Sequence, residues 1–157
     1  MKIKLLLLTL TLTFSQASDY SISYRGFKIG ELNDFKANLS KLILHATPTS
    51  FLAKKLLKGR DFAFYGDKVP SGKNTKLKHD KKFMIYTLKK AIEDKPKFFK
   101  KKVDSKRSVI LKCSDSKCSY TYYKNKKPSG KGIVLFDKNG ELLKFTENNY
   151  NVSVQKM

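Results

Sequence analysis

The side chains in this sequence that are best suited to chemistry are two cysteines and two histidines. Cys113 and Cys118 are the only cysteines of the chain, and four small or polar residues separate them. Thiol oxidoreductases use a C-x-x-C spacing instead, and a zinc site would require His45 and His79 to converge on both cysteines. We therefore predict a disulfide between Cys113 and Cys118, with redox catalysis and zinc binding as the alternatives.

Two predicted strands position these cysteines. Residues 108–113 (SVILKC) and 118–123 (CSYTYY) are rich in β-branched and aromatic side chains, which is typical of strands. Residues 114–117 then form a four-residue hairpin loop. In that register the two cysteines lie opposite each other, at a separation that a disulfide can bridge.

The N-terminus has the layout of a secretory signal peptide. Lys2 and Lys4 form a positive region, an apolar run follows over residues 5–14, and small residues before position 18 match a cleavage site. The run of ten residues is too short to span a bilayer, which takes about 20 residues. We expect cleavage after Ala17 and a mature chain of residues 18–157, with a retained anchor as the alternative. Export to an oxidising compartment favours the disulfide.

Motifs that would indicate catalysis are missing from the sequence, which contains no G-x-S-x-G, H-E-x-x-H or C-x-x-C-H. Residues 66–74 (GDKVPSGKN) are only superficially similar to a phosphate-binding loop, because they have one spacer residue too many and end in Asn74. His45 lies in an apolar segment and is interpreted as a core histidine. We therefore predict a protein that is not an enzyme and that uses no metal or cofactor.

The charge is strongly positive, since 34 basic residues against 13 acidic ones give a net charge of +21. Such a protein attracts polyanions, including anionic lipid head groups and nucleic acid. However, Arg25, Arg60 and Arg107 are the only arginines, and specific recognition of bases or phosphates favours arginine over lysine. The dispersed lysines therefore predict a solvated surface and no specific binding of nucleic acid.

Residues 50–58 are predicted to form a short amphipathic helix, with Thr49 or Ser50 as its cap and Gly59 as its stop. A helix this short needs a surface to dock on, which is either the protein's own core or a membrane. If the protein binds a lipid, the leucines of this helix would cover the apolar interior of the predicted sheet. The lysines of the helix would then lie at the rim of that interior. The candidate ligand or membrane contacts are Leu52, Leu56, Leu57, Lys54 and Lys55.

The rest of the N-terminal half is predicted to be mostly extended. Tyr20, Ile22 and Tyr24 alternate with polar residues, as in a half-buried strand. Residues 26–47 continue as extended chain and contain two further strands, and residues 60–68 add a short one.

The C-terminal half begins with the longest predicted helix, which Asp80 caps and Pro96 ends. The apolar stripe of this helix consists of Met84, Ile85, Leu88, Ala91 and Ile92. Later in the chain, Asn139-Gly140 is typical of a two-residue type I′ hairpin turn, which would pair Phe136 with Leu143 and Val134 with Phe145. These elements indicate a single α+β domain over residues 18–157, in which two helices pack against a mostly antiparallel sheet.

Two segments carry a family resemblance. Residues 20–35 (YSISYRGFKIGELNDF), with Gly26, Lys28, Gly30 and Glu31 at the motif positions, resemble the opening hairpin of a periplasmic bacterial family of unknown function. Residues 136–145 (FDKNGELLKF) are similar to the closing hairpin of that family. The resemblance implies a periplasmic protein with a curved, half-barrel-like sheet around helices and an apolar interior, similar to carriers of lipoproteins or lipids. It implies no catalytic residues.

Three classes of function follow from these observations. The main hypothesis is an exported periplasmic envelope protein, a non-enzymatic binding module for a lipid or another apolar or anionic envelope component. The first alternative is an interaction or assembly factor for an acidic envelope protein. The second alternative is an unrecognised hydrolase, which would need a cleft that joins a histidine to a serine and a carboxylate.

Overall fold

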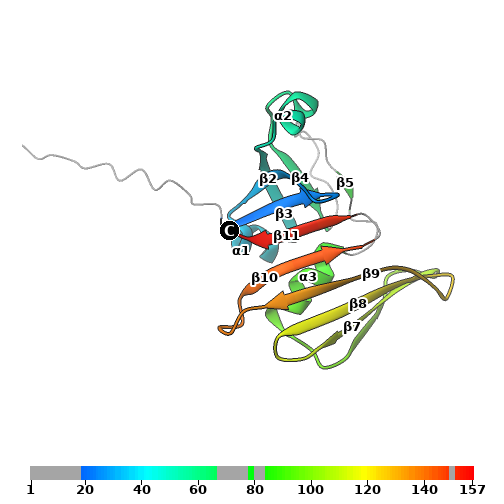
Figure 1. Ribbon diagram of the computed structural model, residues 1–157. Coiled ribbons are helices and arrows are strands. Elements are labelled where there is room, and N and C mark those ends of the chain that lie inside the picture. The colour runs from blue at the N-terminus through cyan, green and yellow to red at the C-terminus, as the bar shows by residue number, and fades with distance from the viewer. Residues whose placement is uncertain (1–18, 67–77, 80–83, 149–150) are drawn as a thin grey trace, which may run out of the picture.

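The computed structural model describes residues 19–66, 78–79, 84–148 and 151–157 (Figure 1). The predicted signal peptide, the Asp80 cap and most of the loop at 66–74 lie outside these ranges. The described helices are α1 (Phe35–Ser40), α2 (Phe51–Leu57) and α3 (Met84–Glu93). The described strands are β1 (Tyr20–Tyr24), β2 (Phe27–Asn33), β3 (Ile43–Pro48), β4 (Phe62–Tyr65), β5 (Lys78–His79), β6 (Phe99–Lys102), β7 (Arg107–Cys113), β8 (Lys117–Lys124), β9 (Lys127–Phe136), β10 (Leu142–Glu147) and β11 (Val152–Lys156).

All of these strands belong to one curved sheet. Their order is β5-β4-β3-β2-β1-β11-β10-β9-β8-β7-β6, so β5 and β6 are the edges of the described sheet, and β1 pairs with β11, the last strand. Neighbouring strands are antiparallel except β4 and β5, which form a two-residue parallel pair. The predicted α+β class with a curved, mostly antiparallel, half-barrel-like sheet is therefore confirmed.

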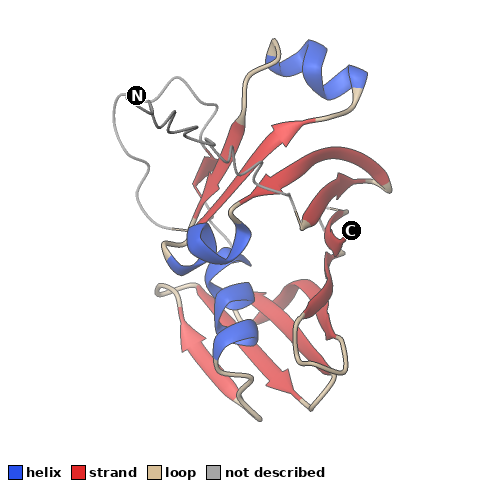
Figure 2. Ribbon diagram, turned by 90° about the vertical axis from the view of Figure 1, so that its left-hand side faces the viewer, coloured by secondary structure: helices blue, strands red, loops and turns tan. Residues whose placement is uncertain are grey.

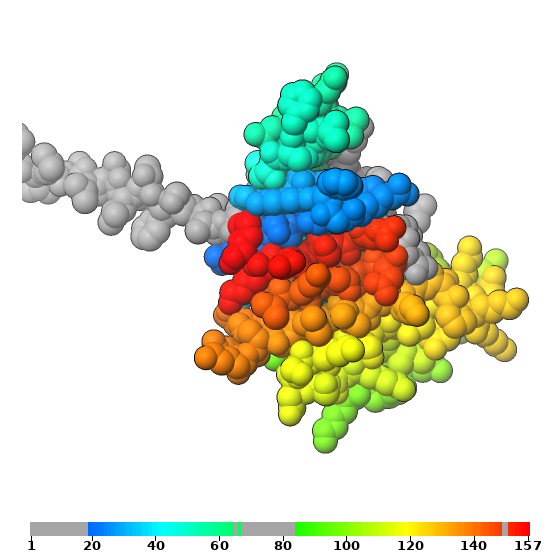
Figure 3. All heavy atoms as spheres, viewed as in Figure 1, coloured from blue at the N-terminus to red at the C-terminus, as the bar shows by residue number. Residues whose placement is uncertain are grey.

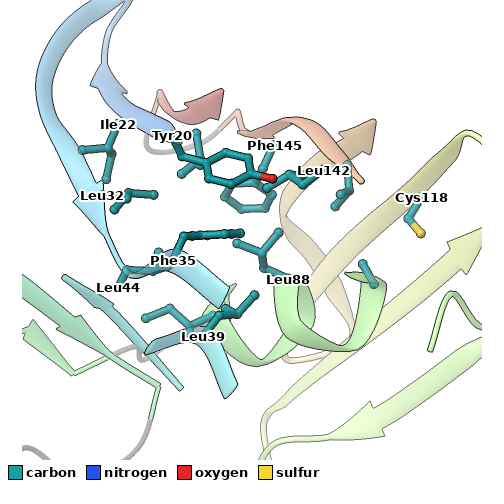
Figure 4. Packing of buried hydrophobic residues seen from close by; sticks show 14 of the residues in the cluster. Tyr20, Ile22, Leu32, Phe35, Leu39, Leu44, Leu88, Cys118, Leu142 and Phe145 are labelled. Carbon is teal, nitrogen blue, oxygen red and sulfur yellow. The ribbon is translucent and has the colours of Figure 1, made fainter. Parts of the chain in front are cut away.

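The hollow of the sheet holds α1 and α3, which lie between its two flanks (Figure 2). Ile85, Leu88 and Ala91 of α3 are fully buried there, and Met84 and Ile92 pack at the border of the core, as the apolar stripe predicted. Side chains from both flanks meet these helices (Figure 4). They include Tyr20, Ile22, Leu32, Leu44, Leu142 and Phe145.

The helix α1 was not predicted, because residues 26–47 were expected to be extended throughout. Asp34 adopts a left-handed conformation with φ 44° and turns the chain out of β2 into the helix. Phe35 and Leu39, four residues apart, then point to the same side and are buried. The centres of the Phe35 and Tyr20 rings lie 4.4 Å apart, and this contact holds α1 on the hollow side of the sheet. The protein therefore has three described helices instead of two.

The cysteine hairpin has the predicted geometry. Cys113 ends β7, Cys118 lies in β8, and the two are direct partners in the antiparallel register and form a disulfide. Cys118 is fully buried in the core, whereas Cys113 lies at its border. The disulfide thus closes a short loop and links the two strands at one end of the β7–β8 hairpin.

We expect Cys113→Ser to lower the free energy of unfolding by only about 2 kcal/mol, because the disulfide closes a short loop and so restricts the unfolded chain little. Urea denaturation of the variant and the oxidised parent measures this difference. Thiol labelling of the oxidised parent should detect no free thiol. A loss above about 4 kcal/mol would contradict the local role assigned to this bond.

The β9–β10 hairpin differs from its predicted form. A two-residue turn was predicted, but the turn spans residues 137–141. The Asp137 carboxylate stabilises this longer turn, because it accepts hydrogen bonds from the N–H groups of Asn139 and Glu141 at 2.9 and 3.0 Å. The predicted pair Val134–Phe145 is present, but Phe136 pairs with Leu142 and not with Leu143.

A bulge between Leu142 and Lys144 causes this difference in register, and it leaves Leu143 exposed.

An ion-pair cluster ties this turn to the C-terminal strand and to α1. Lys156 Nζ lies 2.7 Å from Glu141 Oε2 and 3.4 Å from Asp137 Oδ2, and Lys36 Nζ lies 3.0 Å from Glu141 Oε1. The hydrogen bonds from Lys156 and Lys36 hold the pKa of Glu141 below its usual range. The same pairing with Glu141 raises the pKa of Lys156. These groups are therefore all charged at neutral pH.

Candidate functional site

The helix α2 forms as the sequence predicts. The Ser50 side chain accepts a hydrogen bond from the Ala53 N–H at 3.1 Å and caps the first turn. At the other end Lys58 is left-handed with φ 52°, and the Gly59 N–H donates to the Lys54 carbonyl oxygen at 2.7 Å. Gly59 itself has φ +69°, a conformation that glycine adopts without strain.

The position of α2 is unusual, because the helix connects β3 to β4 beyond the end of the sheet (Figures 1 and 2). Among the described residues, one narrow side of α2 contacts the rest of the protein. Ala53 is buried, and Leu57, four residues later, packs against the border of the core. The helix therefore adds little to the core and projects from the molecule.

The leucines of α2 do not share one environment. Leu52 and Leu56 are 69% and 75% exposed, and Phe51 is 78% exposed. The prediction that Leu52 and Leu56 cover the apolar interior of the sheet is therefore wrong, and of the three leucines only Leu57 faces inward. Residues 52 and 56 lie about 100° around the helix from residues 53 and 57, so the contact that buries Ala53 and partly covers Leu57 leaves Leu52 and Leu56 exposed.

A second exposed apolar group lies beside α2, in the hairpin of β1 and β2. Tyr24 and Phe27, at the two ends of its turn, are 44% and 77% exposed. Figure 3 shows the segment of β1 and β2 directly beneath α2. Of the eight large apolar side chains that are exposed in the described part of the chain, five thus belong to α2 and this hairpin. We call Tyr24, Phe27, Phe51, Leu52 and Leu56 the apolar end.

The charges around the apolar end are almost all positive. The sequence has no acidic residue between Asp34 and Asp61, although six basic residues lie in that interval. Lys54, Lys55 and Lys58 of α2 are exposed, and among the described residues no ion pair involves them. Large exposed apolar groups flanked by cations are typical of surfaces that contact membranes or other partners.

His45 was predicted to be a core histidine, and this prediction is wrong. Leu44 and Ala46 are buried, so His45 lies on the other face of β3 and is about one-third exposed. One ring nitrogen lies 3.4 Å from a carboxylate oxygen of Asp61, and the other lies 3.2 Å from the Asn33 side-chain amide. In the described residues neither ring nitrogen contacts a serine, which the hydrolase alternative requires.

The other candidates for chemistry form no metal-binding cluster in the part of the chain that the structure describes. For His79 the structure describes only the backbone, which lies in β5. Within the described ranges no group of three or more histidine, cysteine, aspartate or glutamate side chains is arranged to hold a metal ion. No helix in the same ranges is long and apolar enough to cross a membrane.

Comparison with known proteins adds no relative. No family model, curated protein or solved structure matches this chain. The resemblance of residues 20–35 and 136–145 to a periplasmic family is therefore still a prediction, and the function must be argued from the geometry of the chain itself.

Proposed function

We propose that this protein is an exported, non-enzymatic module of the cell envelope that binds an anionic lipid component through α2. The observation that carries the proposal is the exposure of Phe51, Leu52 and Leu56 next to lysines, on a helix that lies outside the core. Apolar side chains of this size lose unfavourable contact with water when they enter a lipid phase. The neighbouring lysines are attracted to the phosphates of the head groups.

The tight packing inside the curved sheet favours a lipid contact outside that interior. A carrier that held a lipid in the hollow would leave apolar side chains there in contact with solvent or cargo. Instead, Ile22, Leu88 and Phe145 in the hollow are at most 1% exposed. The outward-facing row of α2 is therefore the better candidate for the lipid contact than the inward-facing row.

Export is supported by two features. The first is the signal-peptide pattern of residues 1–17. The second is the disulfide between Cys113 and Cys118, a bond that persists in oxidising compartments and is rare in the cytosol. Together they favour the periplasm, as the family resemblance implies.

We expect the oxidised protein to float with phosphatidylcholine vesicles that contain phosphatidylglycerol. Replacing Leu52 and Leu56 together with serine should lower the partition constant at least about tenfold, because two apolar side chains no longer enter the lipid phase. Replacing Lys54 and Lys55 together with glutamine should lower it about thirtyfold, but only on anionic vesicles, because each lysine near the surface contributes about 1 kcal/mol. Density-gradient flotation measures all of these constants.

The matched control is Phe98→Ser, because Phe98 is 59% exposed next to Lys97 and Lys100 but precedes β6 at the opposite edge of the sheet. This variant should bind vesicles like the parent. All variants should keep the thermal midpoint of the parent, since the altered side chains are exposed. If the Leu52/Leu56 variant floated as well as the parent, α2 would not be the contact and the proposal would be wrong.

A further inference from the structure

We propose that the turn between β1 and β2 is a second insertion point beside α2, so that the protein docks on the surface of an anionic bilayer with its apolar end toward the membrane. This inference rests on the proposed function and deepens it. It specifies that the partner is a continuous lipid surface and not a single lipid molecule, and it assigns a binding role to Tyr24, Arg25 and Phe27.

The β1–β2 turn presents two aromatic side chains together. Tyr24 and Phe27 are direct partners in the antiparallel register, so their side chains lie on the same face of the hairpin. The two residues between them, Arg25 and Gly26, have φ values of 50° and 82°, which is the pattern of a type I′ turn. Both aromatic rings are therefore held at the tip of a tight hairpin.

The turn is also held in place from the neighbouring strand. The Arg25 N–H donates a hydrogen bond to the Asn151 carbonyl oxygen, next to the start of β11, at 2.7 Å. The Arg25 guanidinium lies over the Tyr24 ring, 5.4 Å from its centre. Because the hairpin is already ordered, little conformational entropy remains to be lost when it inserts.

The turn and α2 lie at the same end of the sheet. The Thr49 N–H donates to the Ile29 carbonyl oxygen at 3.1 Å, and this bond links the chain just before α2 to β2. Phe51 follows Thr49 by two residues, and Phe27 precedes Ile29 by two residues. Phe27 and Phe51 are therefore each two residues away from this hydrogen bond. They belong to adjacent segments of the chain (Figure 3).

The shape and charge of this end fit a lipid surface. Binding sites for single small molecules are concave and enclose their ligand, whereas the side chains of the apolar end are 44% to 78% exposed and project outward. Arg25 at the turn and the lysines of α2 provide cations at both points. Aromatic rings and lysines of this kind prefer the boundary between head groups and acyl chains.

The absence of tryptophan from the sequence allows a direct test. Three variants, Phe27→Trp, Leu56→Trp and Phe98→Trp, each carry one fluorescent reporter, at the turn, on α2 and at the distant control position. The probe is a vesicle of phosphatidylcholine and phosphatidylglycerol with brominated acyl chains, which quench tryptophans at the level of the acyl chains. We expect blue-shifted, quenched emission from residues 27 and 56 and an unchanged spectrum from residue 98. Separately, Phe27→Ser should lower the partition constant about tenfold.

The outcomes separate this inference from the proposed function. If Leu56→Trp responds and Phe27→Trp does not, the second insertion point is wrong and binding through α2 stands. If neither responds and the parent does not float, both proposals are wrong. If Phe27→Trp responds equally to short-chain phosphatidylglycerol below its micelle concentration, the partner is a single lipid and the bilayer assignment is wrong. Circular dichroism of each variant verifies that the exposed substitutions leave the fold intact.

Discussion

Replacing Gly132 with alanine is expected to lower the free energy of unfolding by about 3 kcal/mol or more, as strong overpacking does. Gly132 of β9 lies between its register partners Tyr120 of β8 and Glu147 of β10. A Cβ atom at this position would overlap the carbonyl oxygen of Thr146 and the hydroxyl end of Tyr120. The first of these obstacles is backbone, which cannot move without breaking the sheet.

The Tyr120 side chain cannot easily move away either. Its hydroxyl lies 2.8 Å from the Thr146 carbonyl oxygen and 2.9 Å from Glu147 Oε2, and both Tyr120 and Glu147 are buried. Its ring is stacked on that of Phe145, with 5.8 Å between their centres. A shift of Tyr120 would disturb a buried carboxyl group and the centre of the core together, and a buried polar group that loses its partner is costly.

The matched control for this substitution is Gly59→Ala. Gly59 has φ +69°, but a Cβ there would meet open space. The expected loss is therefore only the backbone strain, about 1–2 kcal/mol. Urea denaturation of both variants compares the two effects. Equal losses would show that the close approach of Tyr120 and Thr146 to Gly132 does not limit the fold.

Leu88→Ala is expected to lower the free energy of unfolding by about 2–5 kcal/mol, the usual range for a truncated core leucine. Leu88 of α3 is fully buried between the two flanks of the sheet (Figure 4). Leu56→Ala, the same substitution on α2, should change stability by less than about 0.5 kcal/mol because Leu56 is exposed.

The same pair of variants should give the opposite result in vesicle flotation. Leu56→Ala should weaken binding and Leu88→Ala, assayed below its unfolding midpoint, should not. Chemical denaturation and flotation of the two proteins measure both properties side by side. If Leu56→Ala lost as much stability as Leu88→Ala, α2 would be docked in the core and the proposed lipid contact would lose its best-placed residues.

Local patterns account for what the sequence predicted correctly. The disulfide and its register depend on two strands and the four residues between them, so Cys113 and Cys118 could be placed without knowledge of the rest of the fold. The apolar stripe of α3 extends over more than two turns, which makes its period unmistakable. By contrast, α1 buries only Phe35 and Leu39, and two residues are too few to distinguish a helical period from a strand.

The candidate site was predicted only in part, because exposure depends on tertiary packing. Periodicity identified α2 and its lysines, but it could not show that the end of the sheet covers Ala53 and Leu57 and leaves Leu52 and Leu56 exposed. Alternation likewise grouped Tyr24 with the buried Tyr20 and Ile22.

The hairpin of β1 and β2 extends past the core, so Tyr24 is exposed. Phe27 is exposed as well, but the sequence did not identify it as a candidate contact. The Arg25-Gly26 turn between two aromatic residues was the one local signal that could have indicated this site.

The cysteine hairpin has a consequence for how the protein matures. With two cysteines in the chain, only one intramolecular pairing exists, so oxidation cannot produce a mispaired isomer. The two thiols also belong to strands that are adjacent in sequence, so the hairpin can bring them together before the distant strands β1 and β11 meet. Oxidation of the protein therefore needs an electron acceptor for one pair of thiols but no disulfide isomerase. The disulfide can form while the rest of the sheet is still assembling.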